Sequence, residues 1–357
     1  MMRKSVLKSL KKYIVVGVIF ISLLTVSTLG LVGCSEASAE ECDEVLYLGE
    51  NKDIKALEKQ AGKDFKIMLF TDLQLWANLF DNKKTYEMMD ALVEEERPDL
   101  IIMPGDNVSG LATKSLLKKL ISKMESYEIP WAPTYGNHDM EGVASIQWQS
   151  KRYESAKYCL FERGEEDLYG MGNYSISISE NGEIVYTLMF MDNGRYIKYE
   201  DGSKREIYIS EEQTEWYERE MKKISSYNKK QTPSMLFSHF AMPEMRTAIE
   251  NLSEIGEDGY FYVPNEQGSG YCKYLPCAAP VNKGFIDRAK NVGLTHVFCG
   301  HDHENNASVF YQGITYTYGL KTGCSPRYWN DADSYGATVI TIGENINFYN
   351  TVKWSAK

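Results

Sequence analysis

Residues 295–306, THVFCGHDHENN, place an apolar run directly before two histidines that stand two positions apart. The run has the length of a buried strand, and His301 and His303 follow where that strand would end. The chain has only five histidines in 357 residues. Two of them at one strand end indicate a shared task, and imidazole is the commonest metal ligand in proteins.

Four other apolar runs also end in polar side chains. They are FKIMLFT (65–71) before Asp72, DLIIMP (99–104) before Asp106, IPWAPTY (129–135) before Asn137 and His138, and MLFS (235–238) before His239. Helical patterns at 83–96 and 112–127 separate the first three runs, and this alternation is typical of an α/β fold. Ligands of open α/β sheets bind at the carboxyl ends of the strands, so we expect these side chains to meet at one edge.

The donors that reach this edge are carboxylate and amide oxygens and imidazole nitrogens, without a thiolate. Such a set suits Zn, Mn or Fe. Two histidines spaced as His301 and His303 can each serve a different ion. A two-metal centre binds a phosphate ester and lowers the pKa of water from 15.7 to about 7, which prepares the water for in-line attack.

The rest of the chain predicts further strands and one more helix. The stretch 173–192 alternates apolar and polar residues around Asn181-Gly182, which indicates a hairpin. Residues 210–224 predict a helix capped by Ser210 and Gln213. Residues 242–283, rich in Gly, Pro and polar residues, predict a long loop that can close over the site, and 307–350 predict several short strands. We find no internal repeat and no second domain boundary.

The motifs GDN (105–107), GNHD (136–139) and GHDH (300–303), in this order, resemble those of the calcineurin-like metallophosphoesterase superfamily. The resemblance runs from about Phe65 to about Asn306. It is greatest with the single-domain branch of purple-acid-phosphatase-like and yeast dephosphorylation-type enzymes. The resemblance implies a four-layer α/β/β/α sandwich with mixed sheets and a centre of two divalent metal ions.

The resemblance also implies a role for each motif residue. Asp72 and His303 would hold the first metal, Asp106 would bridge both metals, and Asn137, His239 and His301 would hold the second. His138 would be a catalytic histidine that is not a ligand, and Asp139 would orient it. His296, the fifth histidine, lies inside the strand-like run and is expected to be structural.

Gln74 departs from the family pattern, which has a histidine at this position. The amide oxygen can ligate a metal, but it is a neutral and weaker ligand than imidazole. Gln74 is either a substitute ligand or neighbour of the first metal, or a packing residue. Purple acid phosphatases also lack this histidine but supply a tyrosine three residues after the bridging aspartate. That position is Ser109 here, so an iron–tyrosinate centre is not expected.

The N-terminus predicts export rather than fold. A basic segment, an apolar segment and Leu31-Val32-Gly33-Cys34 follow one another, and these four residues resemble a bacterial lipobox. We therefore expect a lipoprotein signal peptide at 1–33, lipidation of Cys34, a tether and lead-in segment at 34–63 and the folded domain at 64–357. An uncleaved membrane anchor is the alternative, because residues 13–32 are long enough to span a bilayer. Either way the domain would lie on the extracytoplasmic face of the cell membrane.

Charge and cysteine content limit the partners and the redox chemistry. The formal net charge of −11 argues against nucleic acid as a standing partner, since an acidic protein repels polyanions. It does not exclude a small phosphate ester held by metal ions. Six cysteines remain besides Cys34, and disulfides are possible in an oxidising location, with Cys272 and Cys277 close enough for a small loop.

Together these features predict an extracytoplasmic phosphoesterase in which a hydroxide that bridges two metals attacks phosphorus. One alternative is a weakly active or non-catalytic lipoprotein that binds metal or another ligand on the same scaffold. The other is a phosphodiesterase that acts on nucleotides or phospholipid head groups. The identity of the metals, the native substrate and the oligomeric state stay open.

Overall fold

The computed structural model describes residues 42–194, 196–198, 204–206, 209–279, 283–325 and 334–355. The predicted signal peptide and Cys34 lie outside the described residues. Within the described ranges, no helix combines the length and apolar composition that crossing a bilayer requires.

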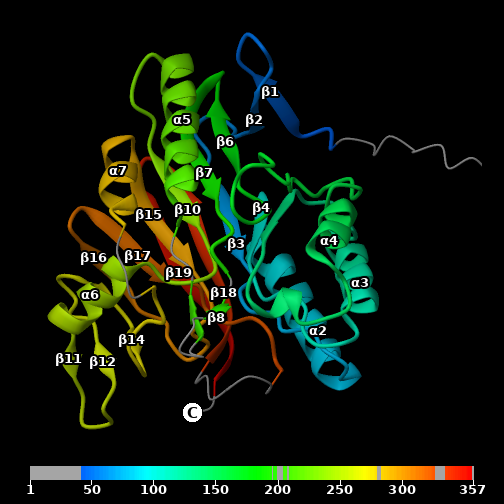
Figure 1. Cartoon of the computed structure of the whole chain (residues 1–357), viewed down its shortest axis with the longest axis vertical. Coiled ribbons are helices and arrows are strands. Elements are labelled where there is room, and N and C mark those ends of the chain that lie inside the picture. The colour runs from blue at the N-terminus through cyan, green and yellow to red at the C-terminus, as the bar shows by residue number, and fades with distance from the viewer. Residues whose placement is uncertain are drawn as a thin grey trace, which may run out of the picture. The chain divides into compact units, whose positions relative to one another are not determined.

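Two large mixed sheets carry the fold (Figure 1). The nine-stranded sheet has the order β1 (Val45–Leu48), β2 (Ile54–Glu58), β6 (Tyr174–Glu180), β7 (Glu183–Phe190), β10 (Ser234–Phe237), β15 (Leu294–Cys299), β17 (Ile314–Tyr318), β16 (Ser308–Tyr311) and β13 (Gly268–Ser269). The five-stranded sheet has the order β19 (Ile346–Ser355), β18 (Ser334–Ile342), β3 (Phe65–Leu69), β4 (Leu100–Pro104) and β5 (Trp131–Thr134). Two small sheets join β11 (Glu254–Ile255), β12 (Phe261–Tyr262) and β14 (Tyr271–Cys272), and β8 (Tyr196–Lys198) with β9 (Lys204–Glu206).

Helices cover the outer face of each large sheet (Figure 1). Those beside the five-stranded sheet are α2 (Leu79–Glu96), α3 (Thr113–Glu125) and α4 (Ile146–Tyr153). Those beside the nine-stranded sheet are α5 (Glu211–Asn228), α6 (Pro243–Leu252) and α7 (Phe285–Asn291), while η1 (His138–Met140) is one short 3₁₀ turn. This arrangement of helices, sheet, sheet and helices confirms the predicted four-layer sandwich.

The two sheets face each other through side chains that alternate along the strands. On β7, β10 and β15 the inward residues Phe190, Phe237 and Phe298 belong to the core shared with β3 and β4. Successive side chains of a strand point to opposite faces. Their neighbours Met189, Leu236 and Val297 accordingly pack under α5, α6 and α7.

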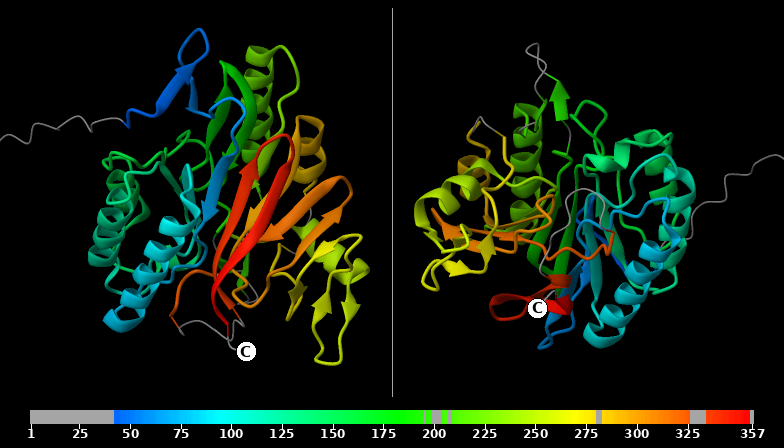
Figure 2. Two further views of the ribbon diagram at one scale, coloured as in Figure 1. Left: turned by 180° about the vertical axis from the view of Figure 1, so that it is seen from behind. Right: turned by 90° about the horizontal axis from the view of Figure 1, so that it is seen from below.

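The last strands complete the five-stranded sheet rather than form a separate unit. β18 pairs antiparallel with β3, so that Thr338 lies opposite Leu69 and Ile342 opposite Phe65. Figure 2 shows these red strands beside the blue β3. β4 is buried along its whole length and β3 at every residue but Lys66, as is typical of strands that are covered on both faces.

The segment 242–283, predicted to be a long loop, contains a helix and four short strands. α6 begins with Pro243 in its first turn, where proline is favoured because the missing N–H would have no helical partner. Met245, Ala248 and Ile249 bury one face of this helix. The prediction was wrong because the proline and glycine content of the whole segment outweighed a ten-residue amphipathic stretch within it.

The other boundaries shift by smaller amounts. α2 begins at Leu79, earlier than the predicted 83, because Asn78 accepts hydrogen bonds from Phe80 and Asp81. The predicted capping box of α5 is present, with Ser210 and Gln213 bonded reciprocally. Part of the segment 34–63 is built into the nine-stranded sheet, since β2 pairs with β6, and the folded region thus begins before residue 64.

We expect Phe237→Ala to lower the free energy of unfolding by about 3–5 kcal/mol, the usual cost of removing a buried phenylalanine. The Phe237 ring is stacked between Phe190 and Phe298, each at a centroid distance of 5.4 Å. The control is Phe310→Ala, because Phe310 is 52% exposed and should cost roughly 0.5 kcal/mol or less. Urea denaturation measures both changes, and equal costs would contradict the placement of Phe237 between the sheets.

Candidate metal centre

The strand ends bring the predicted ligands together. In the five-stranded sheet β3, β4 and β5 run parallel, and in the nine-stranded sheet β10 and β15 run parallel. The loops after these strands supply Asp72, Asp106, Asn137, His239, His301 and His303. Asp72, Asp106 and His239 are buried, with 2%, 1% and 0% of their surface exposed.

Two groups of ligand atoms share one carboxylate. Asp72, Asp106 and His303, which we call the first group, have ligand atoms within 4.8 Å of one another. The same holds for Asp106, His239 and His301, the second group. The only residue common to these two groups is Asp106, the residue predicted to bridge two metals.

The second group converges on a narrow space. His239 Nε2 lies 3.3 Å from Asp106 Oδ2, 3.2 Å from Asn137 Oδ1 and 3.3 Å from His301 Nδ1. His301 Nδ1 also lies 3.1 Å from Asn137 Oδ1. Asn137, predicted to be a ligand, therefore joins the second group through its amide oxygen.

The chemistry of His239 fits a cation in this space. Its Nδ1 lies 3.0 Å from the carbonyl oxygen of Pro104 and can donate to it. With Nδ1 bonded in this way, Nε2 is the nitrogen that would bind a cation. A histidine ligand that donates its second N–H to a carbonyl is the usual arrangement at metal sites.

Buried charge dominates the electrostatics of the centre. Burial alone raises the pKa of Asp106, but the positive charge and hydrogen bond of His239 hold that pKa well below its ordinary value. For His239 itself, burial lowers the pKa, and the charge of Asp106 outweighs burial and raises it to about 9. The pKa of Asp72 is also lowered, because burial is outweighed by its contact with His303. Two ionised carboxylates therefore sit inside the protein and require positive partners.

Close packing of the loops explains two of the motif glycines. A Cβ atom on Gly136 would lie 2.2 Å from Asp106 Oδ1, and one on Gly300 would lie 2.5 Å from Asp72 Oδ2. Any side chain at either position would push a carboxylate away from the centre. Gly136 and Gly300 thus let the GNHD and GHDH loops approach the two aspartates.

Several of these residues have a left-handed backbone. The φ angles are +51° at Asp72, +47° at Gln74, +52° at Asp106 and +71° at His301. A non-glycine residue adopts this conformation at an energetic cost, and residues strained in this way are concentrated at functional sites. The local backbone therefore supports the assignment of these loops to a site.

Gln74 contacts the shared carboxylate. Its Nε2 donates to Asp106 Oδ2 over 2.7 Å, and its Oε1 is buried without a hydrogen-bond partner. This contact agrees with the interpretation of Gln74 as a ligand or neighbour of the first metal rather than as a packing residue. Whether its oxygen ligates a metal stays a prediction, and the unsatisfied oxygen is an atom that a cation could serve.

The carboxylate of Asp139 contacts main-chain groups of two loops. Its carboxylate accepts backbone hydrogen bonds, through Oδ1 from Asn107 and Val108 and through Oδ2 from Gly136. Burial and the charge of Asp106 raise the pKa of Asp139 to about 7. Asp139 therefore ties the GDN and GNHD loops together, and its predicted role in orienting His138 stays a prediction.

Glu141, which was not predicted as a site residue, contacts the imidazole of His138. His138 Nδ1 lies 2.7 Å from Glu141 Oε1, and His138 Nε2 lies 3.8 Å from Asp106 Oδ2. The imidazole thus turns one nitrogen to a carboxylate and the other toward the centre. Glu141 stands three residues after His138, and the 3₁₀ turn at His138–Met140 brings residues with this spacing to the same side. The spacing was the available sequence signal.

Lys321 and Asp302 were also missed. Lys321 follows β17, is 1% exposed and donates its Nζ hydrogen to the main-chain oxygen of Asp72. Asp302, between the two histidines, accepts from the hydroxyl of Tyr318 and from the N–H of Cys277. A single lysine after a strand gives no signal in the sequence, because only the fold brings it to Asp72.

The cysteines and His296 lie outside both ligand groups. The structure shows no disulfide between Cys272 and Cys277, so the small loop that their spacing allows is not closed by one. His296 lies beside Tyr186 and Phe298, and burial lowers its pKa to about 4. This placement agrees with a structural histidine.

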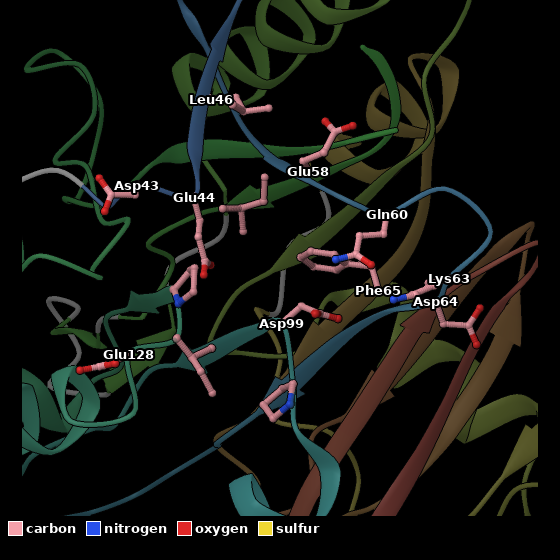
Figure 3. Close-up of a pocket in the computed structure, with 14 residues that line it drawn as sticks. Asp43, Glu44, Leu46, Glu58, Gln60, Lys63, Asp64, Phe65, Asp99 and Glu128 are labelled. Carbon is pink, nitrogen blue, oxygen red and sulfur yellow. The ribbon is translucent and has the colours of Figure 1, made fainter. Parts of the chain in front are cut away.

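A cavity of about 580 Å³ lies at the opposite ends of the strands (Figure 3). Phe65, Asp99 and Pro130 line it, and they stand at or before the amino ends of β3, β4 and β5. Its other charged residues are mainly acidic, including Glu44 and Glu58. An acidic cavity repels phosphate, so the strand ends that carry the metal-ligand groups are the better place for an anionic substrate.

Sequence comparison relates most of the folded region to one family. Residues 65–305 match the profile described as calcineurin-like phosphoesterase. The chain is 28% identical over 280 residues to phosphatase DCR2 of Saccharomyces cerevisiae, covering 70% of this chain and 45% of the yeast protein. It is 26% identical over 258 residues to "Probable inactive purple acid phosphatase 14" of Arabidopsis thaliana, covering 66% of this chain and 61% of the plant protein. The chain thus spans about half to three fifths of the length of these relatives.

The fold is similar to that of a solved enzyme structure. A dimetal phosphatase from Danio rerio superposes with a TM-score of 0.53 over 82% of this chain and 97% of that protein. The sequence identity is 12%, so the likeness concerns the fold alone.

We expect Asp106→Asn to remove most bound metal from both positions, because the shared carboxylate belongs to both ligand groups. Elemental analysis after equilibration with Mn²⁺ or Zn²⁺ should give two equivalents for the wild type. The matched control, Asp167→Asn at an exposed position, should bind as the wild type does. Two equivalents retained by Asp106→Asn would show that this carboxylate does not bridge the metals.

Proposed function

The chain belongs to the calcineurin-like phosphoesterase family, and from this membership we propose that it is a dinuclear metallophosphoesterase that hydrolyses phosphate esters. The observation that carries the proposal is the sharing of Asp106 between two ligand groups. Two cations held by one carboxylate lie close enough to act on the same phosphate. When bound, they supply Lewis-acid activation of water and neutralise the charge of the phosphate.

The protein's own groups account for the remaining requirements. Asp72, Asp106 and His303 would hold one cation, and Asp106, Asn137, His239 and His301 would hold the other. His138 presents Nε2 to the centre and donates a proton to the departing alcohol oxygen. Glu141 fixes the orientation of the ring through its contact with Nδ1.

The N-terminal sequence supports an extracytoplasmic location. The basic and apolar segments followed by Leu31-Val32-Gly33-Cys34 are typical of an exported lipoprotein. We therefore place the enzyme on the outer face of the cell membrane, anchored by lipid on Cys34. Its substrate is then a phosphate ester outside the cytoplasm or a phospholipid head group.

A second candidate is a binding protein that keeps the metal centre without turnover. Gln74 at the first group favours it, since a neutral amide replaces a stronger ligand. Three relatives from Arabidopsis thaliana also carry the word inactive in their names. The arrangement of His138 and Glu141 favours the enzyme, because a binding site has no need of a proton donor.

We expect the purified protein, loaded with Mn²⁺ or Zn²⁺, to hydrolyse an aryl phosphomonoester, an aryl phosphodiester or both, and to lose this activity when a chelator removes the metal. The ratio of the two rates identifies the ester class. The metal-loaded protein in the same buffer without chelator serves as the control. Full metal occupancy with no turnover of either ester would favour the binding protein.

We expect His138→Ala to lower kcat by about 10²–10⁴-fold, the usual contribution of general acid catalysis, with metal content unchanged. Glu141→Gln should lower kcat less, about tenfold, with little change in KM. Both losses should be larger for an alkyl phosphate than for an aryl phosphate, because a poorer leaving group needs more help from a proton. Equal losses on both substrates would contradict the role of His138 and Glu141.

A further inference from the structure

A buried lysine stands directly behind the first group. Lys321 is 1% exposed, and its Nζ lies 2.9 Å from the main-chain oxygen of Asp72. Its backbone is held on both sides, because it forms a parallel bridge with Thr71 and accepts a hydrogen bond from Gly336. These contacts fix the backbone of Lys321 beside the loop that carries Asp72.

The charge of Lys321 acts on the first group. Burial lowers the pKa of Lys321 to about 8, against the opposing effect of the carboxylates of Asp72 and Asp106. Lys321 also adds to the effect of burial in lowering the pKa of His303. Lys321 thus interacts electrostatically with Asp72, Asp106 and His303. Charges in the protein interior interact more strongly than they do in water.

Gln74 acts in the same direction. Its amide N–H donates over 2.7 Å to Oδ2 of Asp106, the carboxylate that both groups share. The main-chain N–H of His301 donates to the carboxylate of Asp72 over 3.1 Å. The two carboxylates of the first group therefore have a cation and N–H donors nearby.

We propose that Lys321 is a built-in competitor of the metal at the first group, which makes this position the weaker and exchangeable one of the two. The inference rests on the proposed metallophosphoesterase and adds a form of regulation to it. The second group would hold its cation tightly, and the first group would fill only when free divalent metal is abundant. The supply of metal would then set the fraction of protein with a complete centre.

Titration calorimetry of the metal-free protein with Mn²⁺ tests the proposal. The wild type should bind two ions in two separate steps. His303→Ala should remove the weaker step, and His239→Ala should remove the tighter step, which assigns each step to its group. Lys321→Met should tighten the weaker step at least about tenfold and leave the tighter step unchanged, because the variant removes a charge near the first group.

Two controls separate this effect from a change in net charge or packing. Lys83→Met makes the same change of charge at a side chain that is 73% exposed, and it should leave both steps within about twofold because solvent screens the charge. Lys321→Arg keeps the positive charge and should keep the weaker step weak. Electron paramagnetic resonance of Mn²⁺ gives an independent readout, since one bound ion and a coupled pair have different spectra.

A further variant keeps the test decisive if Lys321→Met does not fold. Gln74→Glu adds a negative charge to the first group and should tighten the same step. Two steps of equal affinity in the wild type would overturn the proposal, as would a weaker step that neither variant tightens. If the weaker step responds but no phosphate ester is hydrolysed, the proposed function fails and the inference stands. If hydrolysis occurs and the weaker step does not respond, only the inference fails.

Discussion

The burial of two ionised carboxylates, Asp72 and Asp106, is the constraint on which the site depends. A carboxylate inside a protein is unfavourable unless positive groups and hydrogen-bond donors surround it. The imidazoles of His239 and His303, the ammonium of Lys321 and the main-chain N–H of His301 all meet this need. The same demand makes the position attractive to divalent cations.

The fold meets this demand by joining the strand ends of two sheets. The five-stranded sheet delivers the carboxylates and Asn137, and the nine-stranded sheet delivers the histidines. The aromatic side chains of Phe190, Phe237 and Phe298 fill the space between the sheets and keep them in contact. The metal ligands therefore depend on packing that lies away from the centre itself.

The structure divides the two acidic residues near His138 between different tasks. Asp139 holds loops through three main-chain N–H groups, whereas Glu141 contacts the imidazole. One residue therefore preserves the shape of the centre, and the other positions the imidazole of His138. Gln74 and Lys321 concern the first group instead, so they bear on metal occupancy more than on proton transfer.

Much of the fold and the ligand set could be predicted from the chain alone. Apolar runs that end in Asp, Asn or His reveal strands whose loops meet at one edge, because hydrophobic periodicity and strand direction are local properties. The motif order then indicated the four-layer sandwich, which the structure confirms. Helix α6 was missed because its short amphipathic pattern lies within a segment rich in glycine and proline.

Contacts between distant residues could not be predicted in this way. Lys321 meets Asp72 across 249 positions of the chain because β17 and β3 end at the same edge, a relation that exists only in three dimensions. Asp139 and Glu141 are two positions apart in sequence, and the 3₁₀ turn decides that Glu141 contacts the ring of His138. The sequence by itself determined which residue types follow each strand. The tertiary structure decided which of their atoms meet, since electrostatic and hydrogen-bond partners depend on distance in space rather than along the chain.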